Sequence, residues 1–334
     1  MESPRVSVIM PAYNGEKFIE RAVRSVLIQT FQDFEIITID DGSIDKTAEI
    51  IKRLQKEDSR IRLIELKENT GGPATPRTIA CKEAKGEYIA FLDSDDLYYP
   101  EYLELKIKYL EKNPEVHILT SLAWTFDEET KEIINYEHGG PVNNLIKKKA
   151  LEDGEYFKQK QNGVDEIGNV YRYILKNGLD RIKSISSKPL TLYSRHPLQG
   201  SYVENKDPVI FVKRIESLIE DITYEKINNL NRKLRKFFIL AHGIWYAHLG
   251  NFYCLAGDLK KGRGFFIKSL KIKANLFSSG LLFLSFFGFR AYRKIEFFLR
   301  TFQRKIFWRL KTTIKILKYK TSYNKAREIL TQYK

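Results

Sequence analysis

Cysteine and long apolar runs are scarce in this sequence. Its 334 residues include two cysteines, Cys81 and Cys254, which allow at most one disulfide and exclude a small fold held together by several. No secretory signal is evident at the start, so we expect a reducing compartment in which both cysteines are small buried residues. The uncharged apolar run 276–289 has 14 residues, short of the roughly 20 that a membrane-spanning helix needs.

Glycine-rich phosphate-binding loops are also missing. No Walker-type loop occurs, and the expected first strand, residues 6–10, is not followed by a GxGxxG turn. These absences disfavour a P-loop nucleotide hydrolase and a Rossmann dehydrogenase. Hydrophobic residues nevertheless make up 43% of the chain, enough to bury one large core or two modest ones.

Acidic residues are scarce in the last third of the chain. Residues 231–334 contain 24 lysines and arginines but only three acids, Asp258, Glu296 and Glu328, whereas residues 1–230 have a net charge of −6. The overall charge of +15 is therefore a property of the C-terminal region alone. Such a block favours a polyanionic partner, either nucleic acid or an anionic membrane surface.

Aromatic residues accompany this positive charge. In the segment 270–320 the apolar run is followed by aromatic side chains set among cations, namely Phe297, Phe298, Phe302, Phe307 and Trp308. This mixture is typical of a helix in a membrane interface, so we expect 270–320 to contact an anionic membrane surface. A basic helical subdomain packed on the rest of the chain is the alternative. Nucleic acid is disfavoured because the motifs of its main binding classes are missing. The expected location is cytoplasmic, peripheral on the inner face of the plasma membrane.

Short apolar runs alternate with helical patterns through the first 125 residues. Strands are expected at residues 6–10, 34–39, 61–66, 88–92 and 116–122. Helices are expected at 17–29, from an N-cap at Asp45 to residue 54, at 76–84 and at 100–111. This rhythm predicts an α/β fold, a mainly parallel sheet flanked by helices, in which ligands bind at the carboxyl ends of the strands. From residue 230 the pattern is helical, with a hairpin turning near Gly257 and Asp258.

Polar residues follow three of the expected strands. The three segments are 11–14 (Pro-Ala-Tyr-Asn), 40–43 (Asp-Asp-Gly-Ser) and 93–96 (Asp-Ser-Asp-Asp). Because they share one edge of the sheet, we expect them to converge. Carboxylates there can accept hydrogen bonds from a pyrimidine N–H or a ribose hydroxyl, and the ring of Tyr13 can lie against a base. Asp93, Asp95 and Asp96 can hold a hard divalent cation that also binds substrate phosphates. The sequence therefore predicts a nucleoside-diphosphate site.

Four segments, in this order, resemble the family 2 glycosyltransferases of the GT-A fold: VSVIMPAYN (6–14), SVLIQT (25–30), IDDGSID (39–45) and GEYIAFLDSDD (86–96). The resemblance covers residues 3–125 strongly and 160–205 more weakly. It implies an inverting transfer of a sugar from a nucleotide-diphospho-sugar, usually UDP-linked, with Mg²⁺ or Mn²⁺. The implied acceptor is a glycan or lipid-linked hydroxyl in surface-polysaccharide, glycolipid or glycan assembly.

The resemblance also implies a division of the chain. A GT-A catalytic domain is expected over residues 1–225, with a nucleotide and metal half at 1–125 and an acceptor half at 126–225. A basic helical region, in which membrane association is expected, then occupies residues 226–334.

Positions that match the family motifs receive roles on the base side of the donor. Pro11 and Tyr13 would line the base pocket, with Asn14 beside them. Asp41 would accept a hydrogen bond from the uracil N–H, with Asp40 next to it.

Further matches concern the ribose, the diphosphate and the metal. Arg77 would lie near the base or diphosphate, although Thr78 stands where the family usually has Asn. The last motif would supply Asp93, Ser94 and Asp95 to the nucleotide, and Asp95 and Asp96 to the metal.

The acceptor side matches the family less well. An acidic pair followed by Arg six residues after the second acid is found at Asp165, Glu166 and Arg172, but the two acids are in swapped order. The resemblance implies Glu166 as the general base, with Asp165 as the alternative, and places Arg195 or His196 near the diphosphate. A nucleotidyltransferase on a similar sheet, or a non-catalytic scaffold that binds nucleotide and membrane, stays open as another interpretation.

Overall fold

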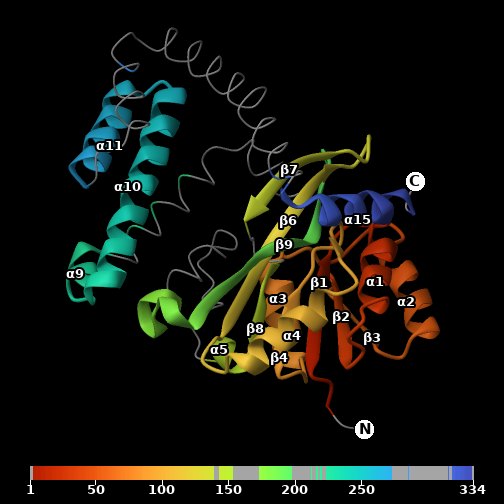
Figure 1. Cartoon of the computed structure of the whole chain (residues 1–334). Helices are drawn as coiled ribbons and strands as arrows, with labels where there is room; N and C mark the ends of the chain where they lie inside the picture. Colours follow the sequence, from red (N-terminus) through yellow and green to blue (C-terminus); the bar gives the residue numbers. More distant parts are fainter. Residues whose placement is uncertain are drawn as a thin grey trace. The chain divides into compact units, whose positions relative to one another are not determined.

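The computed structural model describes residues 3–138, 143–152, 173–197, 223–272 and 318–332, with the isolated positions 212, 216, 219, 285 and 315. The chain forms two compact units, one made of residues 1–199 with 312–334 and the other of 200–311. The units divide after residue 199, before the expected boundary between residues 225 and 226, and the C-terminal residues belong to the first unit (Figure 1).

Four parallel strands form the first half of the sheet. They are β1 (Val6–Ala12), β2 (Phe34–Asp40), β3 (Ile61–Glu65) and β4 (Tyr88–Phe91), arranged in the order β3-β2-β1-β4. Every residue of β1 and β2 is buried, as expected for strands covered on both faces. The predicted parallel α/β arrangement is therefore confirmed for this half.

Mixed pairing continues the sheet beyond β4. The further strands are β5 (Leu97–Tyr98), β6 (Ile118–Asp127), β7 (Ile133–His138), β8 (Leu145–Lys147) and β9 (Ile182–Arg195). The sheet order runs on from β4 as β8-β6-β9-β5, and β7 pairs with β6. The short strand β5 pairs antiparallel with β9, which brings the end of β9 beside the acidic segment 93–96. A 3-10 turn at Leu179–Arg181 precedes β9.

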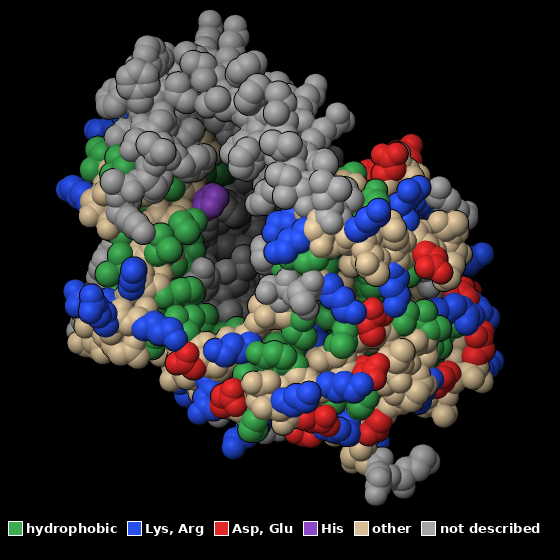
Figure 2. Space-filling view, viewed as in Figure 1, with side chains coloured by type: hydrophobic (Ala, Val, Ile, Leu, Met, Phe, Trp, Pro, Cys, Tyr) green, Lys and Arg blue, Asp and Glu red, His purple; other side chains and the backbone are tan. Residues whose placement is uncertain are grey.

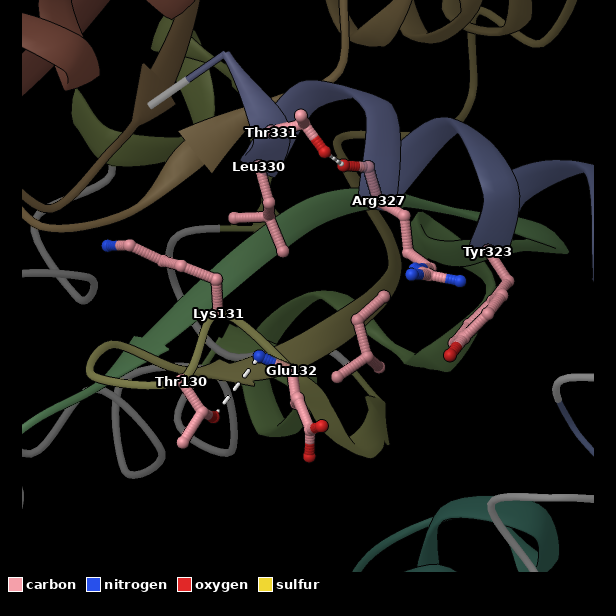
Figure 3. A pocket seen from close by; sticks show the side chains of 8 residues that line it. Thr130, Lys131, Glu132, Tyr323, Arg327, Leu330 and Thr331 are labelled. Carbon is pink, nitrogen blue, oxygen red and sulfur yellow. Dashed lines mark hydrogen bonds between the residues drawn. The ribbon is translucent and has the colours of Figure 1, made fainter. Parts of the chain in front are cut away.

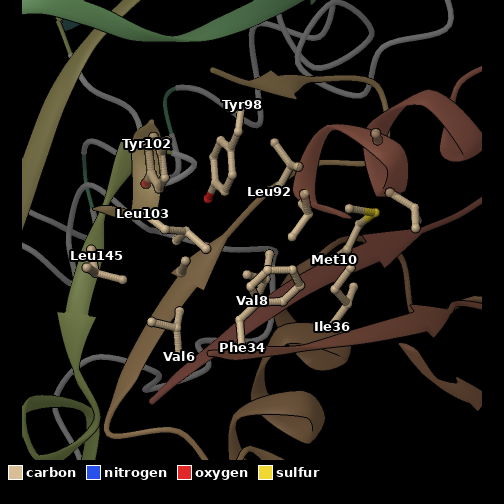
Figure 4. Packing of buried hydrophobic residues seen from close by; sticks show 14 of the residues in the cluster. Val6, Val8, Met10, Phe34, Ile36, Leu92, Tyr98, Tyr102, Leu103 and Leu145 are labelled. Atoms are coloured by element: carbon tan, nitrogen blue, oxygen red, sulfur yellow. The ribbon is translucent and has the colours of Figure 1, made fainter. Parts of the chain in front are cut away.

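Helices cover both faces of the sheet. They are α1 (Ile19–Leu27), α2 (Thr47–Glu57), α3 (Ala74–Glu83), α4 (Tyr102–Lys112) and α5 (Lys148–Glu152). Side chains of α1, α2 and α4 pack on one face, over Val6, Val8 and Met10 (Figure 4). Those of α3 and α5 pack on the other face, over Ile9 and Ile37.

The N-cap of helix α2 lies one residue after Asp45, where the sequence predicts it. The residue before its first turn is Lys46, which makes no side-chain cap. Asp45 nevertheless accepts a hydrogen bond from the Thr47 N–H at 3.0 Å and another from the Glu16 N–H at 3.0 Å. Its carboxylate thus joins the start of α2 to the loop after β1.

A helix from the end of the sequence completes the first unit. Helix α15 (Lys320–Thr331) buries Ala326, Ile329 and Leu330 in a cluster with Trp124 of β6 and Leu192 of β9. The Tyr99 hydroxyl donates to the Ser322 carbonyl oxygen at 2.8 Å. This packing explains why residues 312–334 belong to the first unit.

The described part of the second unit is a helical hairpin. It consists of α9 (Tyr224–Asn228), α10 (Arg232–Leu255) and α11 (Leu259–Ile272). The turn lies at residues 256–258, where the hairpin was predicted to turn. Among the described helices, none combines the length and apolar character needed to cross a membrane. Most of the predicted membrane-contacting segment 270–320 lies outside the described residues.

Both cysteines are buried thiols outside any disulfide. Cys81 packs on the sheet from α3, and Cys254 packs against Phe266 in the α10–α11 hairpin. The expectation of two small buried residues is thus confirmed.

Candidate active site

The loops after β1 and β2 are tied together at the carboxyl edge of the sheet. The Asn14 N–H donates to Oγ of Ser43 at 2.9 Å, and Oδ1 of Asn14 accepts from the Ile44 N–H at 3.0 Å. Asn14 adopts a left-handed backbone conformation with φ of 48°, which asparagine tolerates better than most residues. Its amide oxygen is therefore engaged within the protein, whereas the neighbouring ring of Tyr13 is 49% exposed.

Asp41 joins the loop after β2 to the loop after β3. Its carboxylate accepts hydrogen bonds from the Thr70 N–H at 3.1 Å and from the Thr70 hydroxyl at 3.1 Å. Burial raises the pKa of Asp41, although the Thr70 hydrogen bonds oppose the rise. The adjacent Asp40 is also buried, and its Oδ1 has no hydrogen-bond partner among the described residues.

Gly42 permits this close approach of the two loops. Its φ is +71°, and a Cβ built there would lie 2.7 Å from the Glu68 carbonyl carbon and 2.8 Å from the Asn69 nitrogen. Only glycine fits such a position without moving the backbone. The motif glycine therefore fixes the loop that carries Asp41.

Three carboxylates converge after β4. One oxygen each of Asp93, Asp95 and Asp96 lies within 4.8 Å of the others. Carboxylate oxygens are the ligands that Mg²⁺ and Mn²⁺ prefer, so this donor set fits a hard divalent cation. The structure thus brings together the three acids that the sequence singled out.

Burial and mutual repulsion raise the proton affinity of this cluster. Burial, followed by the neighbouring charges of Asp95 and Asp93, raises the pKa of Asp96 well above its usual range. Burial also raises the pKa of Asp93, against the opposing charge of Arg77. A bound cation would relieve the same repulsion, because it stabilises the ionised form of each carboxylate.

Arg77 reaches the cluster from α3. Its side chain is 3% exposed and forms an ion pair with Oδ1 of Asp93. The guanidinium carbon lies 5.6 Å from the centre of the Phe91 ring. A fixed positive charge therefore stands at the acidic loop.

His196 reaches the same cluster from the end of β9. Its Nε2 lies 2.9 Å from Oδ2 of Asp95, and its ring packs at 4.4 Å from the Phe18 ring. Its Nδ1 is buried and has no hydrogen-bond partner in the part of the chain that the structure describes. The preceding Arg195 accepts a hydrogen bond from the Glu128 N–H through its carbonyl oxygen at 3.0 Å.

An ion pair that the sequence did not reveal lies directly behind the acidic loop. Arg21 of α1 donates to both carboxylate oxygens of Glu128, at 2.7 and 2.6 Å, and to the Asp95 carbonyl oxygen at 3.0 Å. Ser194 donates its hydroxyl to Glu128 at 2.8 Å and its backbone N–H to Oδ1 of Asp96 at 2.9 Å. No local motif marks these residues, because their partners lie far away in the sequence.

The remaining predicted residues have different outcomes. Pro11 is buried at the end of β1, and Ser94 is half-buried between Asp93 and Asp95. The proposed base Glu166, its alternative Asp165 and the associated Arg172 lie outside the described residues.

A groove lies between the β6–β7 turn and α15 (Figure 3). It has a volume of about 410 Å³, and its lining includes Lys131, Glu132, Tyr323 and Arg327. Lys131 also forms an ion pair with Glu128. The groove therefore adjoins the ion pair that supports the acidic loop.

Relatives with similar sequences are glycosyltransferases by name. An uncharacterized glycosyltransferase of Haemophilus influenzae is 30% identical, over 66% of this chain and 74% of its own length. A Bacillus subtilis protein named for teichuronic acid biosynthesis, TuaG, is 43% identical over 43% of this chain and 52% of its own length. The chain spans only 24%, 21% and 18% of the length of three rickettsial glycosyltransferases that it matches.

Solved structures share the fold at low sequence identity. The S. aureus TarS fragment 1–349 in complex with UDP-GlcNAc has a TM-score of 0.63 at 19% identity, over 89% of this chain and 92% of that one. The mannosyltransferase PcManGT of Pyrobaculum calidifontis, in complex with GDP-Man and Mn²⁺, has a TM-score of 0.58 at 16% identity, over 100% of this chain and 88% of that one. Both show the arrangement of sheet and helices that the sequence predicts.

The family itself is established by the sequence. Residues 7–198, more than half of the chain, match the family described as Glycosyl transferase family 2. This match contains all four segments on which the resemblance rests, apart from the first residue of the first segment. The chain belongs to glycosyl transferase family 2.

Proposed function

We propose that this chain transfers a sugar from a nucleotide-diphospho-sugar, UDP-linked in the simplest case, to an acceptor hydroxyl with inversion at the sugar C1. One observation carries the proposal: the acidic cluster 93–96 and the loop that holds Asp41 stand at the carboxyl edge of one sheet. Ligands of open α/β sheets bind at this edge.

The base and ribose would lie between the loops after β1, β2 and β4. The carboxylate of Asp41 would accept from the uracil N–H, and the exposed ring of Tyr13 would lie against the base. Buried Oδ1 of Asp40 has no hydrogen-bond partner among the described residues, which supports a donor group of the ligand at that atom. Asp93 and Ser94 would contact the ribose.

The diphosphate would lie over Asp95 and Asp96. These two residues, with Asp93 as the neighbouring carboxylate, would hold Mg²⁺ or Mn²⁺. The cation would neutralise negative charge on a leaving diphosphate. Arg77 would contribute a second positive charge from α3. Nδ1 of His196, buried without a partner in the described part of the chain, would face the diphosphate oxygens, and Arg195 would lie nearby.

The acceptor hydroxyl needs a general base for direct displacement. We assign this role to Glu166, with Asp165 as the alternative, on the spacing to Arg172 alone. Attack on the face opposite the leaving diphosphate gives inversion. The name of TuaG supports an acceptor in surface-polysaccharide assembly, either a glycan or a lipid-linked glycan.

Nucleotide release tests the proposed reaction. Purified protein is screened by thermal shift against nucleotide-sugars with Mn²⁺, and the stabilising donors are then incubated with acceptor glycans. We expect free nucleoside diphosphate without pyrophosphate, and loss of turnover in Glu166→Gln but not in Asp165→Asn. Pyrophosphate release would instead indicate a nucleotidyltransferase, and donor binding with neither hydrolysis nor transfer would indicate a scaffold.

We further propose that the basic region holds the enzyme at an anionic membrane surface, on the cytoplasmic side. The described helices α10 and α11 contain nine lysines and arginines and no acid, and Figure 2 shows hydrophobic side chains among the cations on this unit. Leu240, Ile244 and Ile267 are 43–47% exposed. Such a surface suits interfacial binding.

Vesicle sedimentation tests the membrane proposal. Phosphatidylglycerol vesicles should pellet the protein at low salt and release it at high salt. The double variant Arg290→Glu/Arg293→Glu should bind weakly. The control Lys56→Glu/Lys82→Glu makes the same charge change at exposed positions of the first unit and should bind normally. Equal binding of both variants would refute a specific role for the basic region.

A further inference from the structure

Arg21 stands between one carboxylate and a cluster of three others. Its guanidinium donates to both oxygens of Glu128, at 2.7 and 2.6 Å, and to the Asp95 carbonyl oxygen at 3.0 Å. The carbonyl contact places this cation directly beside the acids of residues 93–96. Arg21 is nevertheless paired with Glu128 and with none of those three carboxylates in any ion pair of the described residues.

Burial and further hydrogen bonds hold Glu128 in its ion pair with Arg21. Its side chain is 16% exposed, and that of Arg21 is 9% exposed. Besides Arg21, the Glu128 carboxylate accepts from the Ser194 hydroxyl at 2.8 Å and from the Lys131 ammonium. Burial by itself would raise its pKa, but the hydrogen bonds from Arg21 and Lys131 lower the pKa of Glu128 to about 2. Glu128 therefore stays ionised at any physiological pH.

Loss of the Glu128 charge would change what Arg21 can bind. A buried guanidinium needs an anionic partner, because an unpaired charge in the interior is costly. The carboxylates of Asp95 and Asp96 are the neighbouring anions, and planar guanidinium groups bind carboxylates in a bidentate manner. An arginine that occupied them would block the oxygens that a metal ion needs.

We infer that Glu128 is a positioning residue that holds Arg21 on the backbone of the acidic loop and away from its carboxylates, so that the three aspartates stay available to a divalent cation. The inference rests on the metal site of the proposed function. It adds Glu128 and Arg21 as the residues that leave the carboxylates of that site free to bind a cation.

Ser194 connects Glu128 to the acidic loop. Its hydroxyl is fixed by Glu128, and its backbone N–H donates to Oδ1 of Asp96 at 2.9 Å. The same glutamate thus orients the Asp96 carboxylate through β9 and the Asp95 backbone through Arg21. Outer residues of this kind typically alter metal affinity about 10- to 100-fold when they are replaced.

Mn²⁺ binding to the full chain, followed by electron paramagnetic resonance without any donor or acceptor, tests the inference. We expect Glu128→Gln to raise the dissociation constant for Mn²⁺ about 10- to 100-fold. The matched control Glu129→Gln makes the same change at an exposed neighbour and should bind Mn²⁺ like the wild type. The double variant Arg21→Gln/Glu128→Gln removes the competing cation and should recover most of the lost affinity.

The double variant separates competition by Arg21 from general damage. If affinity is not recovered, or if Glu128→Gln binds Mn²⁺ as tightly as the wild type, the inference is wrong. Should Glu128→Gln fail to fold, Glu128→Asp places its carboxylate one methylene short of Arg21, Lys131 and Ser194. It should therefore hold Arg21 less well and weaken Mn²⁺ binding, and unchanged affinity there also overturns the inference. A wild type that binds no Mn²⁺ overturns it too, whereas one that binds Mn²⁺ but transfers no sugar removes only the proposed function.

Discussion

Nε2 of His196 lies 2.9 Å from Oδ2 of Asp95, although 101 positions separate the two residues in the chain. Pairing of β5 with β9 creates this contact, because β5 directly follows the acidic loop. We expect His196→Ala to weaken Mn²⁺ binding roughly tenfold, since Asp95 loses the group that orients it. Titration by electron paramagnetic resonance measures the change. His248→Ala, an exposed histidine of α10, serves as control, and an equal loss there would contradict a specific role.

Neutralising Asp96 should stabilise the metal-free protein while it removes metal binding. The raised pKa of Asp96 means that the folded protein disfavours its ionised form relative to the unfolded chain. Asn keeps an acceptor for the Ser194 N–H and carries no charge. We therefore expect Asp96→Asn to raise the melting temperature in EDTA and to abolish the further rise that Mn²⁺ gives the wild type.

Asp95→Ala and Asp96→Ala give a complementary test of the metal site. Both should abolish metal-dependent transfer without unfolding the protein, as judged by circular dichroism. Unchanged turnover in both variants would contradict the metal assignment.

Gly42→Ala should cost more stability than Gly71→Ala. Both glycines have positive φ, but only Gly42 has backbone atoms of the next loop within 3 Å of a new Cβ, whereas Gly71 has open space. We expect losses of roughly 3 and 1 kcal/mol in the free energy of unfolding. Urea denaturation compares them. Gly42→Ala should also weaken UDP binding, because it displaces the loop of Asp41; equal effects of both substitutions would refute the steric argument.

Helix α15 should stabilise the first unit through its buried face. Ala326 is fully buried against the cluster that contains Trp124 and Leu192. Ala326→Glu should therefore lower the free energy of unfolding by roughly 3 kcal/mol, because an unpaired charge enters an apolar contact. Asn324→Glu, exposed on the same helix, should change it by less than about 0.5 kcal/mol. Chemical denaturation that finds the two variants alike would contradict the packing.

The stability that Glu128 contributes should depend on pH. The folded pKa of Glu128 is about 2, below the unfolded value near 4.3, so the contribution is complete above pH ~5 and is lost as the pH falls toward 2. We expect the wild type to exceed Glu128→Gln by about 2 kcal/mol at pH 7, after allowance for solvent screening. The difference should shrink at pH 3.5. A difference in urea unfolding that is constant with pH would contradict the assignment.

Local patterns sufficed to predict the first half of the sheet and its acidic loops. Strands β1, β2 and β4 are short apolar runs followed at once by polar motifs, so the position of each strand and of its motif could be predicted from neighbouring residues. Both the family and the convergence of Asp41 with the 93–96 cluster at one edge followed from this pattern.

Other parts depend on contacts between distant residues and could not be predicted in the same way. Strand β5 has two residues within an aromatic stretch and exists only because β9 pairs with it. Arg21 falls outside the apolar stripe of its helix, yet Glu128, 107 positions away, allows its burial. Lys106 is likewise fully buried, and its Nζ donates to the carbonyl oxygens of Leu119 and Asn143. Hydrophobic periodicity treats such cations as surface residues.

The position of α15 in the first unit sets a time order for biosynthesis. Trp124 emerges from the ribosome about 200 residues before Ala326, which covers the same cluster. At about 5–20 residues per second, the interval is roughly 10–40 s. During that time the aromatic surface of β6 is not yet covered by α15. The basic segment 270–320 is translated in the same interval. A nascent chain of this protein therefore carries the segment that we propose to bind membrane before its first unit is complete.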